Sequence, residues 1–243
     1  DDWSSLVRRV PLAGKLLYHI YSGPEGRADG LAHYVEELGG TCIEVDLVNG
    51  EGNDIANQDT WNSFLSQLED HLRAGVCAGV VVGPPCNTFS NARGMAGGPQ
   101  PLRGPVGRAR YGLDSLTPEL KAQARLGTCL ALRAVEACTL AHGFRVPFYF
   151  ENPAPRPRCP SIFLLDEVVA LAGLPGVRSY DAPQCNSGAP HLKPTRWLTN
   201  VRLPLHAEPR LCNHDQQDWT VPASGEVYRA AHARLAGKSP AVL

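Results

Sequence analysis

The chain has 243 residues, of which 43% are hydrophobic and 19% are charged, a composition typical of a globular protein with a full hydrophobic core. Its formal net charge of -1 excludes a polycation that holds nucleic acid by overall charge, so such a partner would require a local basic patch. No apolar run approaches the roughly 20 residues that span a bilayer and no signal peptide opens the chain, so we expect an intracellular protein, nuclear or cytoplasmic, without a membrane segment.

The first half of the chain alternates strand and helix patterns. Apolar runs at residues 15–23, 41–48 and 77–83 predict strands, and helical periodicity predicts helices at 28–40 and 59–75. The run "CAGVVVG" has no polar face, so we expect both faces of that strand to be covered. This order predicts the α/β class, with a Rossmann-like, doubly wound and mostly parallel sheet flanked by helices.

The second half begins with a loop rich in glycine, proline and arginine. The loop ends at a long predicted helix, residues 118–143, which starts with proline and finishes with glycine. A fourth strand is expected at 146–153, a helix around 162–172 and a strand near 177–180.

We interpret residues 1–243 as a single domain. Its core covers about residues 15–200, and an irregular tail at 201–243 is expected to close with a helix at 226–235.

Eight cysteines are scattered along the chain, which favours reduced thiols over a disulfide framework. No CxxC pair is present, so we predict no metal site. The nearest metal-binding pattern is Cys212-Asn213-His214, with Cys185 or Cys159 as a further ligand.

Three strand ends carry residues suited to a nucleotide-like ligand. Gly23 and Gly26 would let a ligand approach the backbone, although an ordinary turn explains them as well. Glu44 and Asp46 end the next strand, where an acid either binds ribose hydroxyls or forms a turn. The "NDI" of residues 53–55 is suited to lie beside an adenine. Together these patterns predict an adenosine-type ligand.

Two further strand ends carry reactive groups. In "GPPCNTFS", Cys86 follows two prolines that fix the backbone, which favours a reactive thiolate over a buried apolar cysteine. In "FYFENP", Glu151 follows an aromatic strand, where desolvation is expected to raise the carboxyl pKa, unless the residue serves as a cap. A nucleophilic thiol and a proton-donating acid on one sheet predict an active site.

The ordered set of motifs resembles the cytosine-C5 DNA methyltransferases. "GPPCNTFSNAR" resembles their proline-cysteine motif and "ENP" their Glu-Asn-Val motif. "IYSGPEGRADGL", "IEVD" and "NDI" are similar to their S-adenosylmethionine-binding motifs, and "DAPQCNSGAPHLKPTRWLTN" to their arginine motif. The "KPT" and "PLRG" sequences are also similar to methyltransferase-like domains within retroelement polyproteins. We therefore expect a segment of a longer polypeptide, which suits the start "DDWSS" and the single methionine, Met95.

The resemblance implies a class I S-adenosylmethionine-dependent methyltransferase fold with a small or absent target-recognition domain. A cytosine is flipped into the pocket, Cys86 attacks its C6 and Glu151 protonates or hydrogen-bonds N3. Carbon C5 then accepts the methyl group, and Arg196 orients the base or its phosphate. DNA is favoured over RNA as the substrate.

The resemblance also implies two sets of binding residues. The cofactor would be bound by Tyr21, Ser22, Gly23, Gly26, Glu44, Val45, Asp54, Ile55 and Pro84. The nucleic acid would be bound by Asn87, Ser90, Arg93 and Arg103.

Three alternatives remain open. The first is a weak or inactive methyltransferase-like domain that binds nucleic acid or a protein partner. The second is an amino-methyltransferase, which would require an aromatic residue where Cys86 stands. The third is a zinc-stabilised interaction module built on Cys212 and His214.

Overall fold

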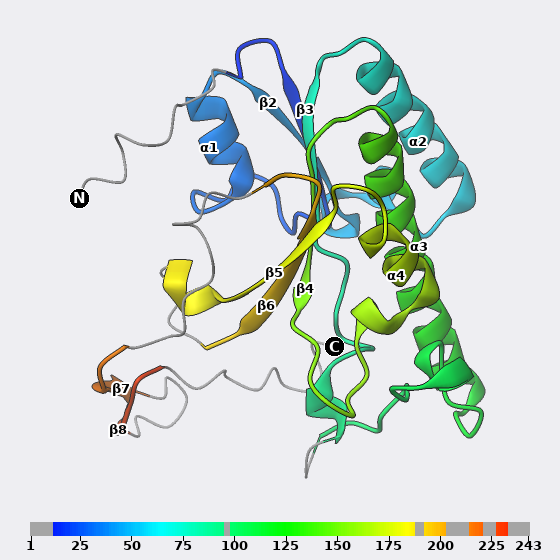
Figure 1. Ribbon diagram of the computed structural model, residues 1–243, viewed down its shortest axis with the longest axis vertical. Helices are drawn as coiled ribbons and strands as arrows, with labels where there is room; N and C mark the ends of the chain where they lie inside the picture. Colours follow the sequence, from blue (N-terminus) through cyan, green and yellow to red (C-terminus); the bar gives the residue numbers. More distant parts are fainter. Residues whose placement is uncertain (1–11, 95–97, 188–191, 203–213, 221–226, 233–243) are drawn as a thin grey trace.

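The computed structural model describes residues 12–94, 98–187, 192–202, 214–220 and 227–232. These residues form a mixed α/β structure in which helices flank a central sheet of mostly parallel strands (Figure 1). This architecture is compatible with the predicted Rossmann-like fold.

The central sheet has six strands in the order β2-β1-β3-β4-β6-β5. Their bounds are β1 Leu16–Ile20, β2 Thr41–Val45, β3 Cys77–Val82, β4 Phe148–Pro153, β5 Arg178–Pro183 and β6 Pro194–Thr199. Strands β1 to β4 pair in parallel, whereas β6 lies antiparallel between β4 and β5. Strand β2 lies on one side of β1 and β3 on the other, so the chain reverses its direction of winding at β1. In open α/β sheets, ligands bind at the carboxyl ends of the strands at such a reversal.

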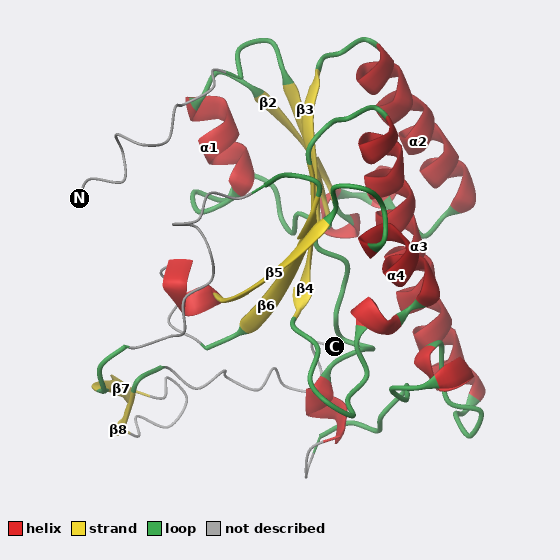
Figure 2. Cartoon of the chain, viewed as in Figure 1, coloured by secondary structure: helices red, strands yellow, loops and turns green. Residues whose placement is uncertain are grey.

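The helices cover the two faces of the sheet unequally. Their bounds are α1 Leu31–Glu37, α2 Gln58–Arg73, α3 Pro118–Gly143 and α4 Asp166–Ala172. Helix α1 lies on one face beside β2, and α2, α3 and α4 lie together on the other (Figure 2). Short 3-10 turns are η2 Leu47–Asn49, η3 Glu51–Asn53, η4 Asn91–Gly94, η5 Gly107–Arg110, η6 Ile162–Leu164 and η7 Gln184–Ser187.

The two longest helices are fixed by caps that their sequences encode. The Asn57 side chain accepts hydrogen bonds from the first backbone amides of α2, and the Thr117 hydroxyl accepts one from Leu120 at the start of α3. These side chains satisfy amides that have no partner within the helix. Proline at the first position of α3 and glycine at its last confirm the predicted bounds 118–143.

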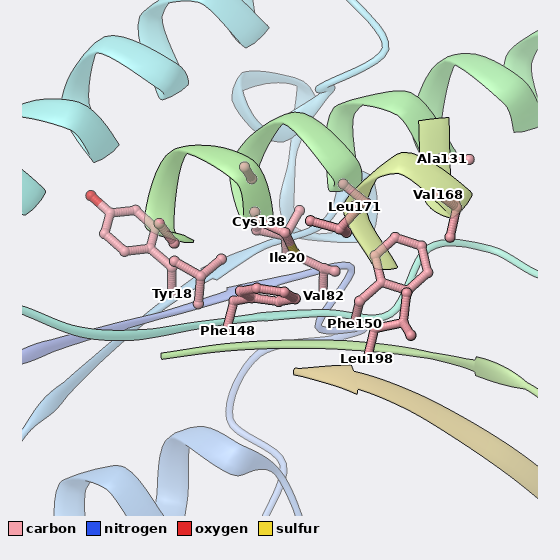
Figure 3. Packing of buried hydrophobic residues seen from close by; sticks show 14 of the residues in the cluster. Tyr18, Ile20, Val82, Ala131, Cys138, Phe148, Phe150, Val168, Leu171 and Leu198 are labelled. Carbon is pink, nitrogen blue, oxygen red and sulfur yellow. The ribbon is translucent and has the colours of Figure 1, made fainter. Parts of the chain in front are cut away.

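The core lies between the sheet and the larger helical layer. Figure 3 shows Tyr18, Ile20, Phe148 and Phe150 packed toward α3 and α4, and all four are fully buried. Alternate residues such as Val81 point to the other face and are only half-buried among the described residues. The prediction that both faces of β3 are covered therefore holds fully for one face and in part for the other.

The tail differs from the prediction. A two-stranded antiparallel hairpin is formed by β7, Gln217–Thr220, and β8, Val227–Ala230, so the helix predicted at 226–235 is wrong where the structure describes it. Trp219 and Tyr228 lie opposite each other, and cross-strand aromatic pairs favour a hairpin over a helix. None of the helices in the described part of the chain is both long and apolar enough to cross a membrane.

Candidate active site

The loop after β3 is tied to the end of β4. Pro84 is buried, and its carbonyl oxygen accepts a hydrogen bond of 2.7 Å from the side-chain amide of Asn152. The backbone amide of Phe89 closes a turn on the carbonyl oxygen of Cys86 at 2.9 Å. Because the hydrogen bond from Asn152 is buried, it fixes the Cys86 loop beside the strand that carries Glu151.

Arg103 supports the Cys86 loop through contacts with Thr88 and Phe89. Its guanidinium donates to the Thr88 hydroxyl, to the Thr128 hydroxyl at 3.0 Å and to the Ala124 carbonyl, and it stacks 3.8 Å from the centre of the Phe89 ring. The residue is only 2% exposed, and burial lowers its pKa to about 10. The prediction that Arg103 faces nucleic acid is therefore wrong, because its donors are used inside the protein.

Arg93 is a second arginine that turns inward. It is 8% exposed and donates to the carbonyl oxygens of Asn87 at 2.7 Å and Gln100 at 3.0 Å, and to the Gln123 side chain at 3.1 Å. Its predicted role in binding nucleic acid is corrected in the same way. These internal hydrogen bonds give the long loop a fixed shape, since a buried guanidinium needs every donor paired.

Helix α3 approaches the loop closely because Gly127 has no side chain. A Cβ atom at Gly127 would overlap the Thr88 hydroxyl and would lie 3.2 Å from an Arg103 nitrogen. This glycine therefore makes room for the hydrogen bonds that support the Cys86 loop. The sequence pattern gave no sign of this requirement, since Gly127 lies in the middle of a well-formed helix.

Cys86 lines a cavity of about 370 Å³ at the carboxyl end of the sheet. The Cys86 side chain is half-buried, so it is both sheltered and reachable. Ser90 lines the same cavity, whereas Asn87 is half-buried and its carbonyl oxygen accepts a hydrogen bond from Arg93. The other lining residues are Phe89, Asn152, Pro153, Ala154, Arg156, Pro160, Ser161, Ile162, Leu192, Lys193 and Pro194.

Glu151 lies near the end of β3 and is not among the residues that line this cavity. One carboxylate oxygen is 3.7 Å from the position that a Cβ atom would take at Gly83, and the other is 3.6 Å from the Lys193 ammonium. The Gln184 amide makes a long contact of 3.5 Å to the same oxygen, and the side chain of Glu151 is 19% exposed. The surroundings of Glu151 are thus more polar than we expected from the aromatic sequence of its strand.

Lys193 is the site residue that sequence reasoning missed. It lines the Cys86 cavity and pairs with Glu151, so it connects the two groups predicted to be reactive. The "KPT" sequence that contains it was noted only for its resemblance.

Arg196 is not placed with Glu151. On β6 it lies opposite Asn152, whereas Trp197 lies opposite Glu151, so Arg196 and Glu151 point to opposite faces of the sheet. Its guanidinium makes a bidentate pair with Asp181 at 2.6 and 2.8 Å, which raises the pKa of Arg196. Arg196 thus shares its face with Asn152, which lines the Cys86 cavity, and its predicted role in orienting the base or its phosphate stays a prediction.

The loop after β1 is folded around the end of β2. Tyr21, Gly23 and Gly26 have positive φ angles of 65°, 75° and 71°. The Gly23 amide donates to Asp46 at 2.9 Å, and the Gly23 carbonyl accepts from Asn49 at 3.0 Å. The left-handed angles explain both glycines, and the Asp46 carboxylate is the acid that reaches the loop.

The remaining predicted cofactor residues divide between two places. Ser22 is half-buried and donates to the Gly23 carbonyl at 3.0 Å. Glu44 pairs in register with His19, on the face opposite to Val45, and burial followed by repulsion from nearby carboxylates raises its pKa. The structure therefore favours Asp46 over Glu44 as the acid at the loop.

A cavity of about 690 Å³ lies at the β2 edge of the sheet. Val45 and Ile55 line this cavity together with residues of α2. Asp54, the neighbour of Ile55 in sequence, is not among the lining residues, and its carboxylate accepts a hydrogen bond of 3.0 Å from the Ala56 amide. Cys86, Gly23 and Pro84 are not among the residues that line this cavity. The predicted cofactor residues thus do not all meet in one described cavity.

No protein-family model, curated protein or solved structure matches this chain significantly. The function is therefore argued from the site itself.

Proposed function

We propose that the protein is an S-adenosylmethionine-dependent methyltransferase that modifies C5 of cytosine in nucleic acid, with DNA favoured over RNA. The observation that carries the proposal is the joint held by Asn152 and Pro84, which brings the strand end of Glu151 to the loop of Cys86. A half-buried thiol at a cavity whose wall includes Lys193, the ion-pair partner of Glu151, supplies a thiol and a carboxyl group of the kinds that covalent activation of a pyrimidine requires.

The chemistry assigned to the chain is a thiolate addition followed by its reversal. The Cys86 sulfur bonds to C6 of a cytosine extruded from its stack, while Glu151 holds a proton at N3. The electron density gained at C5 makes that carbon nucleophilic. After methylation the C5 proton leaves to solvent, the sulfur–C6 bond breaks, and the thiolate is regenerated.

Lys193 acts as a positioning residue in this proposal. Its ammonium pairs with one oxygen of Glu151 and stands at the cavity wall, so it orients the carboxylate toward the base. A carboxyl group held in one orientation speeds the reaction more than a mobile one, because the hydrogen bond to N3 must be kept while the thiolate adds to C6.

The cofactor would bind at the carboxyl ends of β1, β2 and β3. The turn at Gly23 and Gly26, the Asp46 carboxylate and buried Pro84 stand at the reversal of winding, where open α/β sheets bind nucleotide-like ligands. S-adenosylmethionine bound there would supply the methyl group.

One observation favours the alternative of a binding domain without turnover. The Gly23 amide and carbonyl are both used by Asp46 and Asn49, so the loop is already closed on its own chain. In that alternative the loop would keep these hydrogen bonds and S-adenosylmethionine would not bind.

The decisive experiment is trapping with an oligonucleotide that contains 5-fluorocytosine, in the presence of S-adenosylmethionine. We expect a denaturation-resistant adduct that Cys86→Ser abolishes and that Cys129→Ser, a change on α3, leaves intact. Calorimetry with S-adenosylmethionine is run alongside. Cofactor binding without any adduct on DNA or RNA would refute the cytosine-C5 chemistry, and absence of both would favour the binding domain.

A further inference from the structure

Three metal-ligating side chains from η7 and from both ends of the tail hairpin converge at one point, and none of them lines the Cys86 cavity. Cys185 belongs to η7, directly after β5, and is buried. His214 lies three residues before β7 and His232 lies two residues after β8. The Cys185 sulfur and one ring nitrogen of each histidine all lie within 4.8 Å of one another.

The geometry of the two histidines fits a shared metal ion. Nδ1 of His214 is 3.2 Å from Nε2 of His232, and the rings cross at 71° with their centres 5.3 Å apart. Nitrogen atoms bound to one tetrahedral zinc ion at about 2.0 Å lie about 3.3 Å from each other. An imidazole–imidazole hydrogen bond would account for this pair, but it gives no reason for a buried thiol to converge on the same point.

We propose that Cys185, His214 and His232 bind a zinc ion. A thiolate and two imidazoles form a donor set that favours zinc over magnesium or calcium, both of which prefer oxygen ligands. Zinc takes four ligands in a tetrahedron, so one position is left for water or for a donor beyond the described residues. This site departs from the prediction that the chain holds no metal.

The structure also selects among the ligands that the sequence suggested. Cys185 and Cys159 were alternative partners of His214, and Cys185 is the one that lies beside it. His232 was not predicted at all, because its spacing from His214 follows from the hairpin and not from a short motif. Cys212 lies outside the described residues.

The metal would fasten the hairpin to the central sheet. An isolated two-stranded hairpin is marginally stable in water, and most residues of β7 and β8 are exposed. The two histidines flank the hairpin, while Cys185 directly follows β5 in the 3-10 turn η7. Gln184, which precedes Cys185, contacts Glu151. The proposed zinc ligand Cys185 is therefore one residue away from a residue that contacts the candidate active site.

The test is cobalt substitution followed by absorption spectroscopy of the full chain. We expect one cobalt ion per chain, d–d bands of a tetrahedral site and a sulfur-to-cobalt charge-transfer band. Cys185→Ser should remove the charge-transfer band, and His214→Ala or His232→Ala should raise the dissociation constant by more than about 100-fold, since losing even an outer-shell partner costs 10- to 100-fold.

Matched controls separate the site from other thiols and imidazoles. Cys159→Ser and His33→Ala change a half-buried cysteine and the exposed partner of Glu37, and both should leave the spectrum unchanged. His232→Cys should keep the metal and strengthen the charge-transfer band. This variant preserves a ligand, so it also tests the site if alanine variants fail to fold.

Two results would overturn the proposal. One is a cobalt spectrum without a charge-transfer band, as expected if exposed imidazoles alone bind the ion. The other is a band that survives Cys185→Ser. Because these readouts need neither S-adenosylmethionine nor nucleic acid, they succeed or fail independently of the proposed methyltransferase activity.

Discussion

The side-chain amide of Asn152 donates a 2.7 Å hydrogen bond to the carbonyl oxygen of Pro84 and so joins two segments 68 residues apart. Asn152 is 2% exposed, so water cannot replace this partner. The residue that follows Glu151 thus holds the residue that lies two positions before Cys86. This hydrogen bond extends the parallel pairing of β3 and β4 to the loop that carries Cys86 and the strand end that carries Glu151.

Asn152→Ala should lower the free energy of unfolding by about 1–3 kcal/mol, because it leaves the buried Pro84 carbonyl unpaired. It should also reduce the yield of the 5-fluorocytosine adduct, although Cys86 and Glu151 are unchanged. Urea unfolding and adduct assays measure the two effects. Asn62→Ala, a change at an exposed asparagine of α2, serves as the control and should alter neither.

Gly127→Ala should destabilise the protein by about 1–3 kcal/mol, because the added methyl group overlaps the Thr88 hydroxyl and crowds Arg103. Gly143→Ala is the matched control in the same helix, at a position with open space around it. It should stabilise the protein by up to about 1 kcal/mol, as alanine does in helices. Equal effects of the two substitutions on thermal unfolding would contradict the packing described for α3.

Lys193→Met should lower methyl transfer by at least about tenfold while the protein stays folded, because Glu151 loses the cation that orients it. Glu151→Gln should cost more, about 100- to 10,000-fold, if the carboxyl group handles the N3 proton. Lys121→Met, on α3, is the control. Rates under single-turnover conditions distinguish the two changes, and full activity of Lys193→Met would exclude the positioning role.

Stability should fall as the pH drops below about 6.5, because burial lowers the pKa of His19 in the folded protein. Asp46 opposes this shift and Arg27 adds to it. In that range the unfolded chain binds a proton that the folded chain binds less readily, so acid favours unfolding. Urea midpoints between pH 7.5 and 5.5 should decline less for His19→Leu. An identical decline would show that other groups carry the effect.

The sequence patterns predicted those elements whose signals are local. Helix α3 was predicted with its observed bounds, because Pro118 marks its start and Gly143 its end. Strand β3 was predicted from an apolar run without a polar face, and an ordinary turn was one of the two explanations given for Gly23 and Gly26. These features depend on residues within a few positions of one another.

The features that sequence reasoning missed depend on distant contacts. Strand β6 was not predicted, because its sequence "PTRWLT" begins with proline and becomes a strand only by pairing with β4 and β5. Arg103 was expected to bind nucleic acid, as the resemblance implied, whereas its burial depends on acceptors from the distant helix α3. Local patterns therefore located Cys86 and Glu151 but not the residues that hold them.

The position of β6 between β4 and β5 has a consequence for synthesis on the ribosome. Strand β5 emerges first, yet its neighbour in the sheet is β6, so β5 must wait for residues made after it. A nascent chain that ends before Lys193 contains Cys86 and Glu151 but has neither the cation nor the strand beside them. The Cys86 cavity and the ion pair of Lys193 with Glu151 are thus completed only after the last strand of the central sheet has been synthesised.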